Sequence, residues 1–419
     1  METASVQKPG DRYTEINSCR SCQSQFMVPV LSLGKMPLAN SLLPDSRTEE
    51  KIYPLDVLFC RDCALMQLKQ TVSPSLLFDE YCYFSSYSDT AVAEANKLAQ
   101  KMVQERELGK SSLVIEIASN DGYLLQHYVN RNIKVLGIEP AANVADVAES
   151  RGIGTLREYF NQRLALRVVR EFGPADVIHA NNVLAHVPDF NDFLAGIKDL
   201  LKEDGVAVIE FPYLKDMLDR TEFDTIYHEH VFYFSLTALA KAVARHGLFL
   251  TDVERLSIHG GSLRVYISLS PSPKDQRVRA LLSEEERWGA LAPGSYEGFG
   301  EAVRLLRTEL KELLAGLKSD GKSIAAYGAS AKGTVLLNYC DIGRETLDFI
   351  VDRSPHKQGK WAPGSRLPIY DTGKLNEAKP DYVLLLSWNF QDEILSQQWQ
   401  YLKLGGHFIV PLPKAKILL

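Results

Sequence analysis

Residues 113–122 read LVIEIASNDG, an apolar run of strand length that ends in a turn of small and polar residues. Three further runs of this kind follow: KVLGIEP at 134–140, ADVIHANN at 175–182 and GVAVIEFP at 205–212. Amphipathic helical stretches separate them. Short apolar strands that alternate with helices are typical of a doubly wound parallel sheet. The sequence therefore predicts an α/β, Rossmann-like fold for this part of the chain.

The pattern of the sequence changes on both sides of this sheet. Apolar residues recur at helical spacing from Thr90, where Ser88, Asp89 or Thr90 can cap a helix, and two strand-like runs at 249–257 and 262–270 predict an antiparallel hairpin at the sheet edge. A turn-rich stretch, SPSPKDQRV, then begins at Ser270.

Beyond this stretch the strand and helix alternation resumes, which predicts a second Rossmann-like unit. Its strands are expected in SIAAYGASAKG, LDFIVDRS and DYVLLLSW. We predict three domains, at residues 1–87, 88–270 and 271–419.

Four of the six cysteines form two C-x-x-C pairs, Cys19–Cys22 and Cys60–Cys63, with 37 residues between the pairs. Two such hooks supply the four thiolates of a structural zinc site. A redox dithiol or four unrelated thiols are the alternatives. The stretch between the pairs is expected to form loops and short strands, because it is rich in proline: Pro29, Pro37, Pro44 and Pro54.

The composition bounds the class of protein. With 419 residues, 45% apolar and 24% charged, the chain can form two or three cores. The 47 Lys and Arg against 53 Asp and Glu give a net charge of -6, so no basic surface for nucleic acid is expected. No apolar run reaches the roughly 18 residues of a membrane span, and no signal pattern opens the chain. We expect a cytoplasmic protein without a membrane or nucleic-acid partner.

The turn after the first strand is the predicted cofactor site, because ligands of open parallel sheets lie at the carboxyl ends of the strands. It lacks the G-x-G-x-x-G of dinucleotide sites, and an acidic Glu139 at the end of the second strand suits ribose hydroxyls. This favours S-adenosylmethionine over NAD, and an ordinary capped turn remains the alternative. The residues expected at the cofactor are Glu116, Ala118, Ser119, Asn120, Asp121, Gly122, Glu139, Asn181 and Asn182.

A dense polar cluster, YHEH at 227–230, follows the strand GVAVIEFP and is expected to share one lip of the sheet with His186. A metal site or hydrogen-bonded loop residues are the alternatives to catalysis here.

Five blocks of sequence together resemble the nucleotide-sugar C-methyltransferases of deoxysugar and antibiotic biosynthesis, and their order is similar to that of the tetronitrose sugar C-methyltransferases. The blocks are the two C-x-x-C pairs before YFSSYSD, EIASNDGYLL, NVLAHVPD, IYHEHVFYFS and AYGASAKG. The resemblance spans nearly the whole chain. It implies an N-terminal zinc domain, a central S-adenosylmethionine-dependent methyltransferase domain and a C-terminal α/β substrate domain.

The resemblance also implies the reaction and its residues. A base removes the proton beside the ketone of a nucleotide-linked 4-keto-6-deoxy sugar, most often at carbon 3, and the enolate carbon is methylated. A dTDP-linked sugar is the expected substrate, bound by a monomer or a weak homo-oligomer. His230 matches the base, and the other matching active-site residues are His186, Tyr227, Glu229 and Tyr81.

The turn AYGASAKG in the third domain suits an anion through its small residues and the charge of Lys332. A close strand-to-helix turn is the alternative. With the resemblance, we expect the diphosphate or the sugar to contact Tyr327, Gly328, Ser330, Lys332 and Asp352. An O- or N-methyltransferase of a sugar or small metabolite, or a zinc-ribbon adaptor, is the competing hypothesis for the whole chain.

Overall fold

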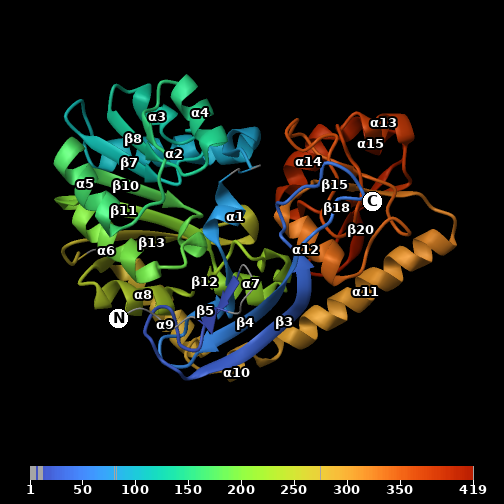
Figure 1. The fold of residues 1–419 in the computed structure, drawn as a ribbon, viewed down its shortest axis with the longest axis horizontal. Coiled ribbons are helices and arrows are strands. Elements are labelled where there is room, and N and C mark those ends of the chain that lie inside the picture. The colour runs from blue at the N-terminus through green and yellow to red at the C-terminus, as the bar shows by residue number, and fades with distance from the viewer. Residues whose placement is uncertain (1–5, 8–12, 80, 82, 274, 419) are drawn as a thin grey trace.

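The computed structural model describes residues 6–7, 13–79, 81, 83–273 and 275–418, so that Cys82 and the side chain of His259 lie outside the described part. The chain folds into a β-rich N-terminal part, a central α/β domain and a C-terminal α/β part (Figure 1). The central domain and the C-terminal domain stand side by side, and the long strands of the N-terminal part run beneath both.

The N-terminal part consists of antiparallel strands and one short helix. Its elements are β1 (Val6–Gln7), β2 (Tyr13–Glu15), β3 (Met27–Pro37), β4 (Ile52–Cys60), β5 (Met66–Leu68), β6 (Gln70–Val72) and α1 (Pro74–Phe78). Strands β1, β2 and β6 form one small sheet, and β5, β4 and β3 form a second one together with β12 (Phe232–Tyr233).

Between the cysteine pairs the expected loop is present at residues 38–51, but the expectation of short strands is wrong. β3 and β4 are long, and they include Pro29, Pro37 and Pro54. β3 tolerates proline because it is the outer strand of its sheet and shifts register after Pro29. Pro54 precedes the part of β4 that pairs with β5, which begins at Val57, so its missing N–H interrupts no ladder there.

The central domain confirms the doubly wound prediction. Its sheet has the order β13-β14-β11-β10-β7-β8-β9, in which β7 to β11 are parallel and the hairpin β13–β14 adds an antiparallel edge. The strands are β7 (Leu113–Ile117), β8 (Lys134–Ile138), β9 (Thr155–Leu156), β10 (Ala175–Asn181), β11 (Leu201–Pro212), β13 (Phe249–Leu256) and β14 (Ser262–Ser268).

Helices cover both faces of this sheet. They are α2 (Asp89–Glu105), α3 (Gln126–Val129), α4 (Ala142–Ser150), α5 (Gln162–Phe172), α6 (Phe190–Leu200), α7 (Leu214–Asp219) and α8 (Leu236–Arg245). The predicted cap at Ser88 is confirmed, because its side chain accepts a hydrogen bond from Ala91 N.

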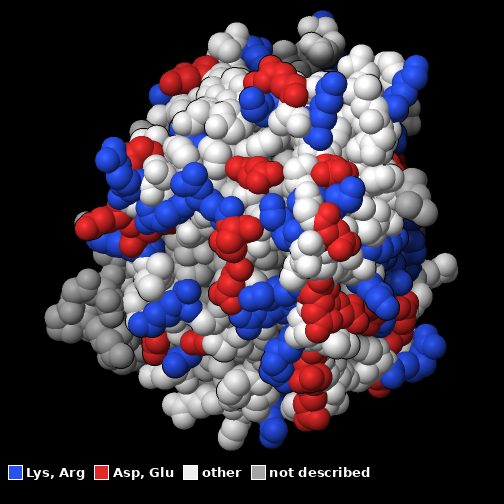
Figure 2. Space-filling model, turned by 90° about the vertical axis from the view of Figure 1, so that its right-hand side faces the viewer, with Lys and Arg blue, Asp and Glu red and all other residues white. Residues whose placement is uncertain are grey.

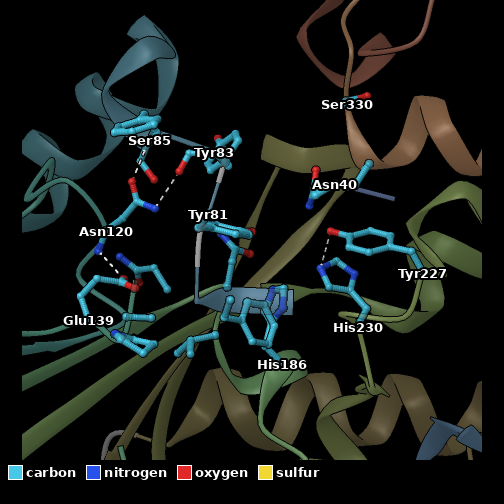
Figure 3. Close-up of a pocket in the computed structure, with 18 of the residues that line it drawn as sticks. Asn40, Tyr81, Tyr83, Ser85, Asn120, Glu139, His186, Tyr227, His230 and Ser330 are labelled. Atoms are coloured by element: carbon cyan, nitrogen blue, oxygen red, sulfur yellow. Dashed lines mark hydrogen bonds between the residues drawn. The ribbon is translucent and has the colours of Figure 1, made fainter. Parts of the chain in front are cut away.

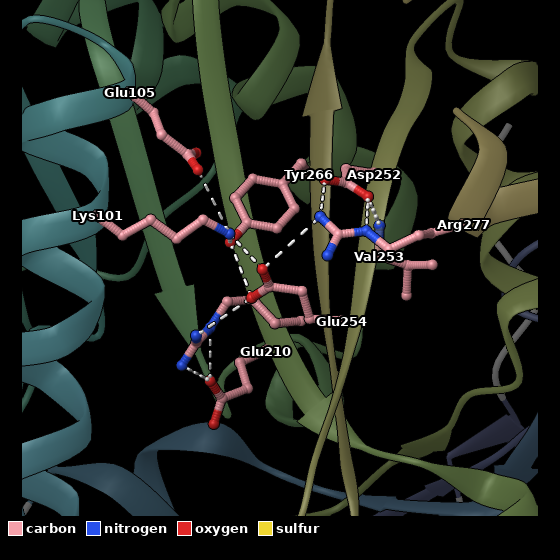
Figure 4. Close-up of polar contacts among 9 residues, drawn as sticks. Lys101, Glu105, Glu210, Asp252, Val253, Glu254, Tyr266 and Arg277 are labelled. Atoms are coloured by element: carbon pink, nitrogen blue, oxygen red, sulfur yellow. Dashed lines mark hydrogen bonds and ion pairs between the residues drawn. The ribbon is translucent and has the colours of Figure 1, made fainter. Parts of the chain in front are cut away.

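A cluster of charged side chains attaches α2 to the antiparallel edge of the sheet (Figure 4). Lys101 donates to Glu254 and, over 2.8 Å, to the hydroxyl of Tyr266. Arg264 on β14 pairs with Glu210 on β11 over 3.0 Å, and both side chains are buried. These contacts hold α2 against the β13–β14 hairpin and hold β14 against β11.

The C-terminal part contains a second parallel sheet, of order β17-β16-β15-β18-β19-β20, with β20 antiparallel at its edge. Its elements are α9 (Gln276–Trp288), α10 (Gly294–Glu297), α11 (Phe299–Ser319), β15 (Ile324–Tyr327), α12 (Ala331–Tyr339), β16 (Ile350–Val351), β17 (Ile369–Tyr370), α13 (Lys374–Ala378), β18 (Tyr382–Leu385), α14 (Gln391–Gln397), α15 (Trp399–Lys403), β19 (His407–Val410) and β20 (Lys416–Leu418).

The domain limits at 87/88 and 270/271 stay a prediction. α9, which follows the second limit, packs against α8 and β13, and its Glu285 accepts hydrogen bonds from the backbone N–H groups of Leu236 and Thr237 at the start of α8.

The outer face of the C-terminal part carries basic and acidic side chains that alternate over short distances (Figure 2). In the described ranges, no helix combines the length and the apolar character that crossing a bilayer requires.

Candidate active site

A cavity of about 1270 Å³ lies where the three parts of the chain meet (Figure 3). Its wall includes the carboxyl ends of the central strands, the segment after the zinc-type cysteines and the turn before α12. Each turn lies at the carboxyl edge of its own parallel sheet, and the packing of the two domains brings the predicted cofactor turn and the predicted substrate turn to one cavity.

The turn after β7 presents part of its backbone to this cavity. Ala118 and Asn120 adopt left-handed φ angles of 54° and 50°, and Gly122 follows with a φ of 78°. A Cβ atom on Gly122 would lie 2.4 Å from the side chain of Ile153, so the turn can pack this closely only with glycine.

Glu139 directly follows β8, and its side chain contacts the turn after β7. Its two carboxylate oxygens accept hydrogen bonds from the backbone N–H groups of Asn120, at 3.0 Å, and Ala141, at 2.9 Å. Burial raises the pKa of Glu139, and the two N–H donors oppose that shift. The carboxylate is fixed and lines the cavity, which suits it to accept hydrogen bonds from a pair of ribose hydroxyls.

Of the nine residues expected at the cofactor, five line the cavity: Ala118, Asn120, Glu139, Asn181 and Asn182. Four lie outside its wall: Glu116, Ser119, Asp121 and Gly122. Glu116 is buried within β7, where burial raises its pKa well above the usual value. Asp121 accepts a hydrogen bond from Ser86 N, so it connects the turn to the segment that covers it.

The segment around Tyr83 also contacts this turn. Asn120 donates through Nδ2 to the carbonyl of Tyr83 at 3.0 Å and accepts at Oδ1 from Ser85 N at 2.9 Å. Phe84 in the same segment stacks on His356 of the C-terminal part, with ring centroids 4.4 Å apart. The segment therefore bridges the two sides of the cavity.

His230 points into the cavity and is held by two hydrogen bonds (Figure 3). Its Nδ1 lies 2.9 Å from the carbonyl of Thr225, and its Nε2 lies 2.7 Å from the hydroxyl of Tyr227. Because a carbonyl can only accept, Nδ1 carries the proton in the neutral ring, and Nε2 accepts from Tyr227. The geometry thus leaves the basic nitrogen on the cavity side.

His186 stands beside this pair, with its ring 4.7 Å from that of His230 in an edge-to-face arrangement. Burial lowers the pKa of His186 to about 4, so its imidazole is neutral near pH 7. Val231 N donates to the carbonyl of Ala185 at 2.7 Å, which ties the two histidine segments together.

Glu229 lies behind the cavity wall rather than in it. Both of its carboxylate oxygens accept from Nδ2 of Asn40, at 2.8 and 2.9 Å. Tyr81, which also lines the cavity, is a second hydrogen-bonding partner of this carboxylate. Glu229 is therefore connected to the cavity through two side chains that line it, Asn40 and Tyr81.

All five residues expected at the substrate line the cavity from the C-terminal side: Tyr327, Gly328, Ser330, Lys332 and Asp352. Ser330 caps α12 by accepting from Gly333 N, and Asp352 accepts from Ala329 N at 2.7 Å. The ammonium group of Lys332 lies 4.6 Å from the centre of the Trp388 ring. This turn offers a helix N-terminus and a cation to a ligand.

Several lining residues escaped the sequence analysis. They include Asn40, Tyr83, Tyr159, Phe160 and Lys357. Tyr159 and Phe160 follow β9, which is only two residues long and gives no periodic signal. Their position after a parallel strand was the one clue that could have found them. Asn40 lies in the N-terminal part of the chain, and no sequence pattern around it indicates that it lines this cavity.

The side chains of Cys19, Cys22, Cys60 and Cys63 form one cluster. Their sulfur atoms all lie within 4.8 Å of one another, with Cys19 to Cys63 at 3.6 Å and Cys22 to Cys60 at 3.5 Å. Zinc–sulfur bonds of about 2.3 Å place tetrahedral ligands about 3.8 Å apart. The donor set fits structural zinc, and Gln67 donates from its amide to Cys19 Sγ at 3.1 Å.

Family models match the three parts of the chain. Residues 19–78 match a zinc binding domain, residues 91–253 a methyltransferase domain and residues 257–413 a C-methyltransferase C-terminal domain. Over 409 residues the chain is 36% identical to the C-methyltransferase NovU of Streptomyces niveus. The match covers 96% of this chain and 97% of NovU.

Solved structures resemble a smaller share of the chain. The magnesium protoporphyrin IX methyltransferase ChlM of Synechocystis PCC 6803 is 12% identical, with a TM-score of 0.34, over 43% of this chain and 79% of that one. An S-adenosylmethionine-dependent methyltransferase of Clostridium acetobutylicum ATCC 824 is 9% identical, with a TM-score of 0.34, over 44% and 94%.

Glu139→Ala is expected to weaken the binding of S-adenosylmethionine by about 10- to 100-fold, the worth of hydrogen bonds to a charged group. Two backbone N–H groups also lose their acceptor, which costs roughly 1–3 kcal/mol of folding stability. Calorimetry and thermal unfolding measure the two effects. Asp146→Ala, at an exposed carboxylate on α4, is the control and should change neither. Unchanged affinity in Glu139→Ala would refute the ribose assignment.

Proposed function

We propose a substrate on a plain premise: this chain belongs to the family of S-adenosylmethionine-dependent C-methyltransferases. The proposed reaction is the methylation of a ring carbon beside the ketone of a nucleotide-linked 4-keto-6-deoxy sugar. Carbon 3 is the proposed position, and dTDP the proposed nucleotide. The single observation that carries the proposal is the basic nitrogen of His230, held toward the same cavity that the cofactor turn enters.

The class of the enzyme, its use of S-adenosylmethionine and its zinc-binding domain do not depend on the proposed substrate. The chain is a methyltransferase that uses S-adenosylmethionine and carries a zinc-binding domain. When bound, S-adenosylmethionine supplies an electrophilic methyl group on a positively charged sulfur. The residues that would hold it are Ala118, Asn120, Glu139, Asn181 and Asn182.

A carbon nucleophile must be made, since an unactivated C–H group cannot attack a methyl group. The neighbouring ketone makes this C–H acidic, and Nε2 of His230 takes the proton. The hydroxyl of Tyr227, which donates to Nε2 in the structure, first turns to the ketone oxygen; this frees the Nε2 lone pair for the substrate proton, and the hydroxyl donates to the enolate oxygen as it develops. Nδ1–H stays on the carbonyl of Thr225, which holds the ring in place as it becomes charged.

His186 is the second proposed contact of the keto oxygen or of a sugar hydroxyl. Since its pKa is low, it acts as a neutral hydrogen-bonding group. Once the enolate has formed, the carbon needs only to be held at attack distance from the methyl group.

The C-terminal turn is the proposed site of the nucleotide diphosphate. Two buried carboxylates, Glu222 and Asp224, lie close enough to Lys332 for its charge to influence their pKa values, and Asp224 accepts from Trp388 Nε1 at 2.6 Å. Asp224 thus fixes the indole of Trp388 against which the Lys332 ammonium lies, and Lys332 itself lines the cavity.

Lys332→Met is expected to raise KM for the nucleotide-linked substrate about 10- to 100-fold, because one charged contact to phosphate is lost. The dissociation constant of S-adenosylmethionine should not change, since Lys332 lies on the opposite side of the cavity from Glu139. Steady-state kinetics and calorimetry measure the two quantities. An unchanged KM would remove Lys332 from the phosphate site.

Solvent exchange tests the reaction. The enzyme is incubated in deuterated water with a panel of dTDP-, GDP- and CDP-linked 4-keto sugars, and NMR follows the hydrogen beside the ketone and locates the new methyl group. We expect exchange and C-methylation, and loss of both in His230→Ala. Turnover without exchange would favour an O- or N-methyltransferase.

Three further expectations belong to this proposal and are open to direct measurement. They are a cytoplasmic location, a monomer or weak homo-oligomer, and the division of the chain at residues 87/88 and 270/271.

A further inference from the structure

Asn40 belongs to the zinc-binding part of the chain, yet it lines the cavity beside the proposed catalytic pair (Figure 3). It lies in the loop that follows β3, 189 residues before Glu229 in the sequence. Its Nδ2 donates to both carboxylate oxygens of Glu229, at 2.8 and 2.9 Å. A side chain from one domain thus holds a carboxylate of another.

The loop around Asn40 is fastened on its other side to the C-terminal part. The carbonyl of Ala39 accepts from the hydroxyl of Thr334 at 3.0 Å. Leu43 exchanges two backbone hydrogen bonds of 2.9 Å with Trp361. The position of the amide is therefore set by three separate segments and not by a free loop.

Glu229 depends on this amide because it has little contact with water. Its exposed fraction is 2%, and its pKa is raised to about 7 by burial, while the hydrogen bonds from Asn40 and Tyr81 act in the opposite direction. The other titratable groups nearby are the phenol of Tyr227 and the imidazoles of its chain neighbours His228 and His230 and of His186.

We propose that Asn40 is a positioning residue that acts through Glu229: its amide fixes the orientation of the carboxyl group and favours its ionised form beside the Tyr227–His230 pair. A carboxylate there stabilises the imidazolium that forms when His230 takes a proton. Only this catalytic consequence rests on the proposed function. The hydrogen bonds themselves do not.

The test is a pH titration of the glutamate side chains. The full chain, with its zinc, is labelled with ¹³C at glutamate Cδ, and Glu229→Gln identifies the resonance of Glu229. In Asn40→Leu, which has a similar size and no N–H donor, we expect the midpoint of Glu229 to rise by roughly one unit or more. Asn40→Asp keeps the shape and replaces the donor with an acceptor, so its midpoint should rise at least as far.

Thr334→Val is the matched control. It removes a contact of the same loop at Ala39 and leaves the amide of Asn40 in place. A merely structural role of the loop would move the Glu229 midpoint in this variant too, whereas we expect it to stay. Zinc content and S-adenosylmethionine affinity report on folding in each variant, and Asn40→Asp gives the answer if Asn40→Leu does not fold.

The outcomes separate this inference from the proposed function. An unchanged midpoint in both Asn40 variants overturns the inference, even if the enzyme methylates a keto sugar. A raised midpoint supports it, even if every keto sugar fails as a substrate. With an active substrate, the acid limb of kcat should move to higher pH in Asn40→Leu by the same amount as the midpoint.

Discussion

His230→Ala is expected to lower kcat by about 10²- to 10⁴-fold, the usual contribution of a positioned general base. The imidazole is the group whose Nε2 faces the cavity while its Nδ1–H is fixed by Thr225. Without it, the hydrogen beside the ketone should also stop exchanging with solvent. The affinity for S-adenosylmethionine should remain, because Glu139 and Asn120 lie at a different wall of the cavity.

His228→Gln provides the matched control for this prediction. His228 is two residues away and equally buried, but its ring packs against Tyr53 and Nε2 lies 3.3 Å from the Tyr53 carbonyl. It does not line the cavity. We expect exchange and turnover to persist in this variant. Wild-type exchange in His230→Ala would show that another group is the base.

Tertiary pairing explains what the sequence could and could not predict of the fold. The long apolar strands β7, β8, β10 and β11 carry a clear pattern, and the parallel sheet follows from their alternation with helices. The strands β9 and β17 have two residues each, too few for a periodic signal. β12 is equally short, and its pairing with β5 depends on a contact across 165 residues that no local pattern encodes.

The same distinction holds for the site. His186 and His230 follow strands of one parallel sheet, and this order alone indicates that they share its carboxyl edge. Their rings do lie 4.7 Å apart. Asn40 is different, since it reaches Glu229 only because the zinc-binding part packs beneath both other domains. Sequence order also could not reveal that the Glu229 carboxylate lies behind the wall of the cavity.

Cys60→Ser is expected to release zinc and to destabilise the N-terminal part by on the order of several kcal/mol, because metal binding contributes directly to the folding of such domains. Cys60 ends β4, and its backbone N–H bonds the carbonyl of Leu65 just before β5. Leu68 N in β5 in turn donates to the carbonyl of Val231 at 2.8 Å, next to His230. Loosening β5 should therefore lower turnover, although the base itself is unchanged and the cofactor wall stays intact.

Metal analysis, thermal unfolding and S-adenosylmethionine calorimetry distinguish this result from general misfolding. Cys340→Ser is the control, because Cys340 is a buried cysteine outside the tetrad, and its replacement should leave the zinc content unchanged. Cys60→Ser should lose zinc and turnover while keeping most of its affinity for S-adenosylmethionine, since the binding turn belongs to the central sheet. If that variant retains its full zinc content, the four-cysteine ligand set is wrong. If it loses zinc with no loss of turnover, the connection from β5 through Val231 does not hold the catalytic segment.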